Sequence, residues 1–440
     1  MIELSRALAR SFRAVLRHSL LADAPRGPWP LLLCRAGEGG LTLHALNGDL
    51  AVRYHLPGKR PPDTIAFRAS LLAEFEGRGD DPVLLEQVAF GKGRASWDEG
   101  GVPRSPEIET VTPDSVPAFP ARPKKLVPMP DDFLVALAEA ARTAGRESAR
   151  LAVSRVLLRG KASEVIATDG RQLLVQAGFP LPWQDDVLVP SVPAFGCREM
   201  EGAAPVRLGR GVGHVAVVAG PWAFLLGIDG TSRYPAVDTV IPSPRAAKST
   251  LRIHPDDGAF LISTLPRLPG AGDHLSPVTL DLGRTAAVRA RGEGGGRVTE
   301  VALARSASSG SPMRLCMDRR YLRRALQLGF AELQVERPDA PVVCRDGRRT
   351  YLWMPLDQGG ALPPSDNAVR VSSAEPEKAR TPATPPSQPE NPRRRRPMPA
   401  PRTTVTRPGP AANRPPRRPA RRSRPASPRW RRRPRRYARC

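Results

Sequence analysis

Residues 164–174 place an Asp-Gly pair, Asp169 and Gly170, between two short apolar segments. Glycine adopts the positive φ of a tight turn without strain, and the β-branched and aliphatic residues on both sides favour extended backbone. The segment therefore predicts a tight reversal between two strands, or between a strand and its continuation. An aspartate directly before glycine commonly caps its own backbone, so we interpret Asp169 as a turn residue and not as a catalytic acid.

The elements around this turn recur in the same order along the chain. A helix-like segment at 132–142 and a strand-like segment at 151–159 precede the turn, and strand-like segments separated by polar turns fill residues 31–56 and 277–303. A helix followed by several strands, repeated roughly six times, indicates a repeat architecture and not a doubly wound parallel sheet. The expected fold class is therefore α+β.

Changes in composition divide the sequence into domains. Residues 117–130 are rich in proline, and the apolar content falls sharply after residue 358. We expect three repeated domains, each with two helices plus antiparallel sheets, and a disordered Pro/Arg-rich tail that has too few large apolar residues to offset chain entropy. The expected ranges are 1–125 for domain one, 126–245 for domain two, 246–358 for domain three and 359–440 for the tail.

Most of the positive charge lies in this tail. The whole chain has a formal net charge of +25, and residues 376–440 contain 21 Lys and Arg against 2 Asp and Glu. The body is therefore only mildly basic, and the tail predicts a partner that carries negative charge.

An arginine stripe follows the first predicted helix, at residues 4–21. The spacing of its arginines places them on one helical face. They are Arg6, Arg10, Arg13 and Arg17. The stripe has two interpretations, a solvated helix face or a cationic surface for nucleic-acid phosphates.

The five cysteines give no sign of a metal or disulfide site. They are Cys34, Cys197, Cys316, Cys344 and Cys440, with no CxxC pair and no histidine at ligand spacing. We therefore expect no metal, no cofactor and a reducing cytoplasm. No apolar run has the length of a membrane span, and the start lacks a signal-peptide core, so we expect no membrane segment.

The sequence also lacks the motifs of common catalytic sites. A P-loop, GxSxG and HExxH are all missing. The glycine-rich residues 209–213 superficially resemble a phosphate-binding loop, but no helix is predicted after them, so we expect a hairpin turn there. We interpret the body as a binding protein and not as an enzyme.

Three motifs lie in order along residues 1–358. They are Ala167-Thr168-Asp169-Gly170 followed by Leu173, Arg233-Tyr234-Pro235 followed by Val240-Ile241-Pro242, and Tyr351 followed by Met354-Pro355-Leu356. Together they resemble the signatures of the bacterial DNA sliding clamps, the beta subunits of DNA polymerase III. The resemblance implies three sliding-clamp domains and a processivity role in DNA replication.

In this family, a short linear motif of polymerases and repair proteins docks in an apolar pocket between domains two and three. The resemblance implies the same pocket in this chain. Its residues would be Val153, Thr168, Gly170, Arg171, Gln172, Leu173, Pro235, Val240, Leu275, Met354, Pro355 and Leu356. An aliphatic groove with few polar groups suits the anchor side chains of a peptide. Without the resemblance, these apolar residues would be interpreted as core.

The resemblance also implies contact with duplex DNA, because the helices of clamp domains line a channel around it. This favours the phosphate interpretation of the arginine stripe, and Arg26 and Arg150 match channel positions of the family. The implied partners are the DNA polymerase III catalytic subunit, the clamp loader and a second copy of the chain. In the implied head-to-tail homodimer ring, domain one of each copy meets domain three of the other. The implied location is cytoplasmic and nucleoid-associated.

Two departures from the family suggest a divergent paralogue. Arg171 and Gln172 stand where clamps commonly have His-Arg, which is expected to alter the polar rim of the pocket. Clamps usually end close to the Met-Pro segment, whereas this chain continues for 82 residues beyond Gln358. The alternative function is a nucleoid-type DNA-binding protein, in which the basic tail binds DNA and the body is a folded platform.

We expect the tail to add a salt-sensitive affinity for nucleic acid, because clustered arginines displace condensed counterions from phosphates. If the tail neutralises about six phosphates, the slope of log affinity against log salt on duplex DNA steepens by about five units. The measurement is a salt titration of linear-duplex binding by the full chain and by a variant that ends at residue 375. Equal slopes would mean that the tail arginines do not engage DNA.

Overall fold

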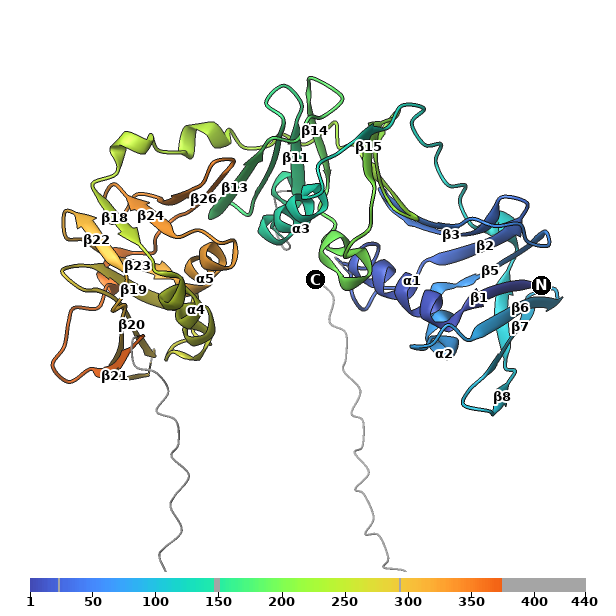
Figure 1. Cartoon of the computed structure of the whole chain (residues 1–440), viewed down its shortest axis with the longest axis horizontal. Helices are drawn as coiled ribbons and strands as arrows, with labels where there is room; N and C mark the ends of the chain where they lie inside the picture. Colours follow the sequence, from blue (N-terminus) through green and yellow to red (C-terminus); the bar gives the residue numbers. More distant parts are fainter. Residues whose placement is uncertain (23, 146–150, 293, 374–440) are drawn as a thin grey trace, which may run out of the picture. The chain divides into compact units, whose positions relative to one another are not determined.

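The computed structural model describes residues 1–22, 24–145, 151–292 and 294–373 (Figure 1). The described chain follows the predicted order, with a helix followed by antiparallel strands in each of the three expected regions. We refer to these regions as domains one, two and three. Their boundaries remain predictions.

Domain one packs its helices against antiparallel strands. Its elements are β1 (Ile2–Ser5), α1 (Arg6–His18), β2 (Leu31–Gly37), β3 (Gly40–Asn47), β4 (Leu50–Leu56), β5 (Asp63–Arg68), η1 (Ala69–Leu71), α2 (Leu72–Phe75), β6 (Pro82–Ala89), β7 (Lys92–Asp98), β8 (Pro103–Arg104), β9 (Glu107–Val111) and η2 (Pro113–Ser115). The Ser5 hydroxyl accepts a hydrogen bond from the Leu8 amide at 3.1 Å, which caps the start of α1. The predicted first helix is therefore confirmed within narrower bounds.

The described residues of domain two contain one α-helix. Its elements are β10 (Val127–Pro128), α3 (Phe133–Thr143), η3 (Leu151–Ser154), β11 (Arg155–Arg159), β12 (Glu164–Thr168), β13 (Gln172–Ala177), β14 (Asp186–Pro190), η4 (Pro193–Gly196), η5 (Arg198–Met200), β15 (Val206–Arg210), β16 (His214–Ala219), β17 (Trp222–Gly227), η6 (Val237–Val240) and η7 (Pro244–Ala246). In its described residues, the expected second helix is reduced to the 3₁₀ turns η4 and η5, because Gly196 at the end of η4 disfavours a longer helix. The hairpin predicted at residues 209–213 is confirmed, since β15 and β16 pair antiparallel.

The predicted reversal at Asp169 and Gly170 is also confirmed. Strands β12 and β13 pair antiparallel with Thr168 opposite Leu173, and Gly170 has a φ of +92°. One carboxylate oxygen of Asp169 accepts hydrogen bonds from the amides of Arg171 at 2.8 Å and the following residue at 2.9 Å. Asp169 therefore holds the turn, as the sequence predicts.

In domain three, the residues that the structure describes form two α-helices. Its elements are β18 (Ser249–Arg252), α4 (Pro255–Thr264), η8 (Leu265–Arg267), β19 (Pro277–Leu282), β20 (Ala286–Gly292), β21 (Gly295–Ala302), β22 (Ala307–Gly310), β23 (Arg314–Asp318), α5 (Arg319–Gln327), β24 (Glu332–Val335), β25 (Val342–Arg345), β26 (Arg349–Trp353), η9 (Gln358–Gly360) and β27 (Val369–Ser372). The Asp318 carboxylate caps the start of helix α5, because it accepts a hydrogen bond from the Arg320 amide at 2.8 Å.

Two strand pairs join neighbouring domains. Strand β4 of domain one pairs antiparallel with β17 of domain two. Strand β13 of domain two pairs antiparallel with β26 of domain three (Figure 1). The first pair lies within a 13-stranded sheet and the second within a 9-stranded sheet, while β23, β19, β20, β21 and β27 form a separate 5-stranded sheet. Backbone hydrogen bonding therefore continues from one domain into the next.

A buried polar network closes the junction between domains two and three. The Tyr351 hydroxyl donates to the Gln172 side-chain oxygen at 2.7 Å, and the Gln172 side-chain nitrogen donates to the Asp169 carboxylate at 2.9 Å and the Thr143 carbonyl at 3.3 Å. Burial raises the pKa of Tyr351, which keeps its hydroxyl protonated as a donor. The network ties the Asp169 turn, α3 and β26 together.

The chain remains part of domain three beyond residue 358, where the disordered tail is expected to begin. Residues 359–373 include η9 and strand β27, and β27 pairs in parallel with β21. This expectation was wrong because backbone pairing to a sheet edge stabilises a segment that has only a few large apolar side chains, at Leu362, Val369 and Val371. The rest of the expected tail, residues 374–440, lies outside the described residues.

We expect the substitution Tyr351→Phe to lower the free energy of unfolding by about 1–3 kcal/mol, because it leaves the buried Gln172 oxygen without its donor. Chemical denaturation monitored by circular dichroism measures the loss. Tyr234→Phe is the matched control, since the Tyr234 hydroxyl lies 3.5 Å from its acceptor, the Ile166 carbonyl. Equal effects of the two substitutions would contradict a stabilising role for the network.

Candidate functional site

Strands β13 and β26 present a shared apolar face at the junction of domains two and three. Leu173 lies directly opposite Leu352, and the Met354 amide donates to the Arg171 carbonyl at 2.9 Å. Because alternate residues of a strand face the same side, Met354 continues the face formed by Leu173 and Leu352. The pairing register therefore places the Asp-Gly turn motif and the Met-Pro motif beside each other.

The segment that links domains two and three packs on the same face. Val237, Tyr234 and Ile241 belong to the apolar cluster that contains Leu173 and Leu352. Burial raises the pKa of the Tyr234 hydroxyl, as expected for a ring packed in this cluster. All three predicted motifs therefore meet at one place.

Two large apolar side chains remain exposed beside this cluster. Val240, within the linking segment, is 49% exposed, and Met354, at the end of β26, is 42% exposed. We call Leu173, Leu352, Val237, Val240 and Met354 the junction surface. Leu173, Leu352 and Val237 form the buried floor of this surface. Val240 and Met354 are exposed and offer apolar contact to a partner.

The implied pocket residues differ in exposure. Val153, Thr168, Gln172 and Leu173 are buried; Gly170, Arg171, Pro235, Val240 and Met354 are exposed; Leu275, Pro355 and Leu356 are half-buried. The Leu356 amide donates to the Cys316 carbonyl on β23 at 2.8 Å. Leu275 lies in a loop before β19 that Arg319 binds through the Ser276 carbonyl at 3.0 Å. The turn, the linking segment and Met354 thus share the junction surface, whereas the structure ties Leu275 to α5.

Gln172 does not belong to the polar rim that the sequence predicts. Its side chain is 8% exposed and is engaged by Tyr351 and Asp169 within the junction network. The prediction was wrong because a strand residue directly after the turn faces the interior on this side of the sheet. Arg171, which is exposed, is the one of the two that can contact a partner.

The arginine stripe of α1 divides into paired and exposed members. Arg6 donates to the Glu99 carboxylate at 3.2 Å, and Arg13 donates to the Glu76 carboxylate at 2.8 Å. Arg10 and Arg17 are exposed. Arg6 and Arg13 are therefore paired with acidic residues of their own domain. Arg10 and Arg17 are accessible to an external anion.

The other two predicted DNA-binding residues are more distant in sequence. Arg26 is exposed in the loop after α1, and Arg150 lies outside the described residues.

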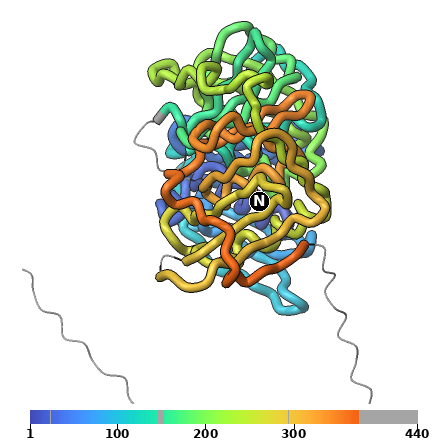
Figure 2. The backbone as a smooth tube through the Cα atoms, turned by 90° about the vertical axis from the view of Figure 1, so that its left-hand side faces the viewer, coloured from blue at the N-terminus to red at the C-terminus, as the bar shows by residue number. Residues whose placement is uncertain are grey.

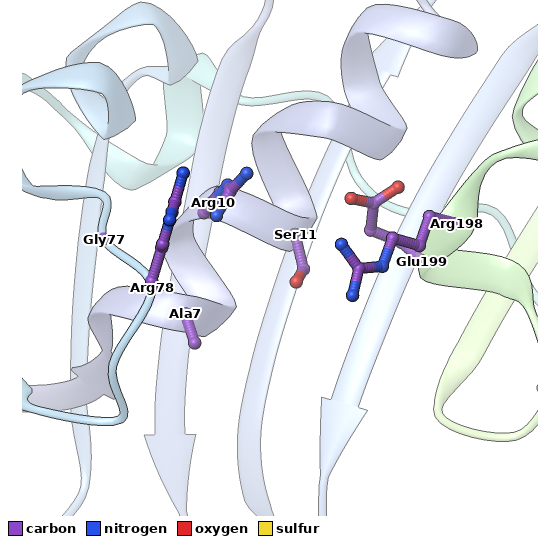
Figure 3. Close-up of a pocket in the computed structure, with 7 residues that line it drawn as sticks. All are labelled: Ala7, Arg10, Ser11, Gly77, Arg78, Arg198 and Glu199. Atoms are coloured by element: carbon purple, nitrogen blue, oxygen red, sulfur yellow. The ribbon is translucent and has the colours of Figure 1, made fainter. Parts of the chain in front are cut away.

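A basic cavity lies where α1 approaches domain two (Figure 3). It has a volume of about 660 Å³ and is lined by Arg10 from α1, Arg78 from the loop after α2, and Arg198 with Glu199 from η5. Three guanidinium groups around one hollow favour a phosphate-bearing ligand. The sequence did not predict Arg78 and Arg198, because neither belongs to a periodic pattern and only the packing of domains one and two brings them to α1.

Other classes of site find no support in the described part of the chain. No group of three or more His, Cys, Asp or Glu side chains there is placed to hold a metal ion. Among the described helices, none is long and apolar enough to cross a membrane.

No protein-family model matches the sequence, and no curated protein matches it. Solved structures do match. The DNA polymerase III subunit beta of Pseudomonas aeruginosa aligns with a TM-score of 0.64 at 15% identity, over 81% of this chain and 99% of that chain. The fold is that of the bacterial sliding clamps.

Two further sliding clamps align equally well. The clamp of Bacillus subtilis gives a TM-score of 0.64 at 15% identity, over 80% of this chain and 98% of that chain. The DNA polymerase III beta chain of Streptococcus pneumoniae gives 0.64 at 13% identity, with the same shares covered. The expected sliding-clamp fold is therefore confirmed, at identities of only 13% to 15%.

Proposed function

We propose that this chain is a ring-forming DNA sliding clamp, which encircles duplex DNA and tethers DNA polymerase III and other partners for processive replication. The sliding-clamp fold carries the proposal, because it extends over 98% to 99% of the length of the solved clamps compared above. In this role the chain acts in the cytoplasm at the nucleoid and has no active site of its own. Its partners are duplex DNA, the polymerase catalytic subunit, a clamp loader and a second copy of the chain.

The basic cavity supports contact with the DNA backbone. Arg10, Arg78 and Arg198 line it, and Arg17 and Arg26 are exposed on the same domain as Arg10. Contacts between guanidinium groups and phosphates do not depend on the base sequence, so a ring held by such contacts can move along the duplex. This property is what a processivity factor requires.

The junction surface supports binding of a partner peptide. Val240 and Met354 offer exposed apolar contact, and Arg171 offers a charge at its border. A short peptide with apolar anchor side chains fits such a surface better than a charged or sugar ligand does. We therefore assign this surface to the polymerase and to other clamp partners.

A nucleoid-type DNA-binding protein is the second candidate, and the composition of residues 376–440 supports it. Topology separates the two functions. A clamp stays on closed circular DNA and leaves when the circle is cut, whereas a tail-bound protein dissociates equally from both forms.

We expect the triple substitution Arg10→Gln, Arg78→Gln, Arg198→Gln to weaken binding to duplex DNA uniformly across sequences. It should flatten the slope of log affinity against log salt by about two to three units, since each lost phosphate contact contributes about 0.9. Fluorescence anisotropy over a salt series measures the slope. Arg13→Gln is the control: its side chain pairs with Glu76, so it should lower thermal stability and leave the slope unchanged. Identical slopes for the triple variant and the unmodified chain would rule out this cavity as a phosphate site.

We expect Val240→Asp combined with Met354→Asp to abolish binding of a peptide carrying the clamp-binding motif, because a carboxylate facing an apolar anchor must be desolvated without a partner. Folding should survive, since both side chains are about half exposed. Isothermal titration measures the affinity.

Two comparisons complete this experiment. Val88→Asp changes another valine, 48% exposed and in domain one, and should leave peptide binding intact. Leu173→Asp should unfold the junction instead, because Leu173 is 2% exposed. Undiminished affinity in the folded Val240 and Met354 double variant would place the peptide site elsewhere.

A further inference from the structure

The last described residues cover an edge of the domain-three sheet. In the order β23, β19, β20, β21, β27, strand β21 would be the edge strand if β27 were removed. Strand β27 pairs with it in parallel over four positions, from Thr299 opposite Val369 to Ala302 opposite Ser372. We call residues 357–373 the strap. Figure 2 shows this orange-red segment running over the outside of the yellow strands of domain three.

The strap crosses the whole sheet before it reaches this edge. At its start, the Gln358 side-chain oxygen accepts a hydrogen bond from the Cys316 amide of β23 at 2.9 Å. In its middle, the Leu362 amide donates to the Thr279 hydroxyl of β19 at 2.8 Å. Near its end, Arg297 of β21 donates to the Asn367 carbonyl at 2.9 Å. One contact in each part fixes its course over the sheet.

A buried carboxylate anchors the end of the strap. The Ser373 hydroxyl donates to the Asp257 carboxylate at 2.6 Å, and the Ser373 amide donates to the Ala302 carbonyl at 3.1 Å. Asp257 lies on α4, is fully buried and also accepts from the Ser306 hydroxyl at 2.6 Å. Burial acts to raise the pKa of Asp257, but the hydrogen bonds from Ser306 and Ser373 outweigh it and lower that pKa below its usual range. The carboxylate thus stays ionised and holds the strap in place.

Other features make the strap displaceable. Strand β27 is four residues long and parallel, the less stable of the two pairing geometries. Val369 is 43% exposed, and a cavity of about 240 Å³ is lined jointly by Gly360 and Leu362 of the strap and by residues of β19 and β20. Little apolar area therefore holds β27 against β21.

We infer that the strap is an intramolecular cap, which keeps the β21 edge closed to a second copy of this chain until β27 is displaced. An unpaired strand edge is a template for another strand, and covering it with a segment of the same chain prevents such pairing. The inference rests on the proposed clamp function for the identity of the partner, a second copy. The inference adds that a segment of the chain itself, the strap, controls whether two copies associate.

Domain one offers a strand edge that matches the uncovered β21. Strand β8 and the first residues of β9 pair with β7 on one side, and β9 reaches β5 only at Thr110 and Val111. Strand β9 carries the exposed Glu107 and Glu109, of which Glu107 lies 3.8 Å from the Lys92 ammonium, whereas β21 carries the exposed Arg297. Opposite charges on the two edges favour heterologous pairing of domain one with domain three, the arrangement that closes a ring.

Proline in β27 tests the cap in the full-length chain. The Ser373 amide points at β21, so the amides of Val369 and Val371 point the same way, because alternate strand residues share one orientation. The double substitution Val369→Pro, Val371→Pro removes both donors and should release the strap. Val369→Thr, Val371→Thr is the matched control, because it changes the same side chains and keeps the donors and the strand preference.

Sedimentation velocity at micromolar concentration is the measurement. We expect one chain mass for the unmodified protein and the threonine control, and a doubling of the mass for the proline variant. Adding Glu107→Arg and Glu109→Arg to the proline variant should return the mass to that of one chain. The same mass for the unmodified and proline proteins, whether one chain or two, would overturn the inference.

Cys316 reports independently on whether the strap has moved. It is 3% exposed and lies under Gly360, so maleimide should label it faster in the proline variant than in the threonine control, with the labelled peptide identified by mass spectrometry. Fast labelling without a change in mass would show a released strap whose edge does not accept a second copy, and the inference would fail.

Failure of the cap and failure of the clamp function have different signatures. If the cap fails, retention on closed circular DNA is the same with the strap in place and released. If the clamp function fails, the proline variant still doubles its mass, but cutting the circle changes retention in neither protein.

Discussion

Backbone pairing across the domain junctions is the interaction on which the described structure depends. The β4–β17 and β13–β26 pairs satisfy main-chain donors and acceptors that would otherwise lie at open sheet edges. The register of β13 against β26 also sets Leu173 opposite Leu352, and thereby aligns the turn, the linking segment and Met354. The same hydrogen bonds that hold two domains together therefore create the surface assigned to partners.

Features encoded within a few residues could be predicted from the sequence. The turn at Asp169 and Gly170 follows from local backbone preference and from a carboxylate that caps the next two amides. Helix α1 follows from the periodic spacing of its residues, whereas its Ser5 cap is seen only in the structure. The sliding-clamp fold itself was accessible because three short motifs of this chain resemble the family's signatures, although its identity to solved clamps is only 13% to 15%.

Features that depend on distant partners could not be predicted in the same way. Arg6 meets Glu99 across 93 positions, and Tyr351 meets Gln172 across 179. Neither contact leaves a local pattern, so the sequence could not show that Arg6 is paired or that Gln172 is buried. Strand β27 was not predicted for a related reason. Its pairing to β21 depends on backbone hydrogen bonds, which any sequence can form, so no apolar pattern marks it.

The junction surface has a consequence for how this chain can change over evolution. Leu173 and Leu352 pack between domains two and three, and they also form the floor of the surface that we propose for partners. A substitution at either position would alter stability before it altered specificity. Variation in partner choice is thereby confined to the exposed border, at Met354, Val240 and Arg171, where side chains can be exchanged without cost to the fold. Paralogues with this junction can therefore differ in the partners that they bind while the packing between the two domains stays the same.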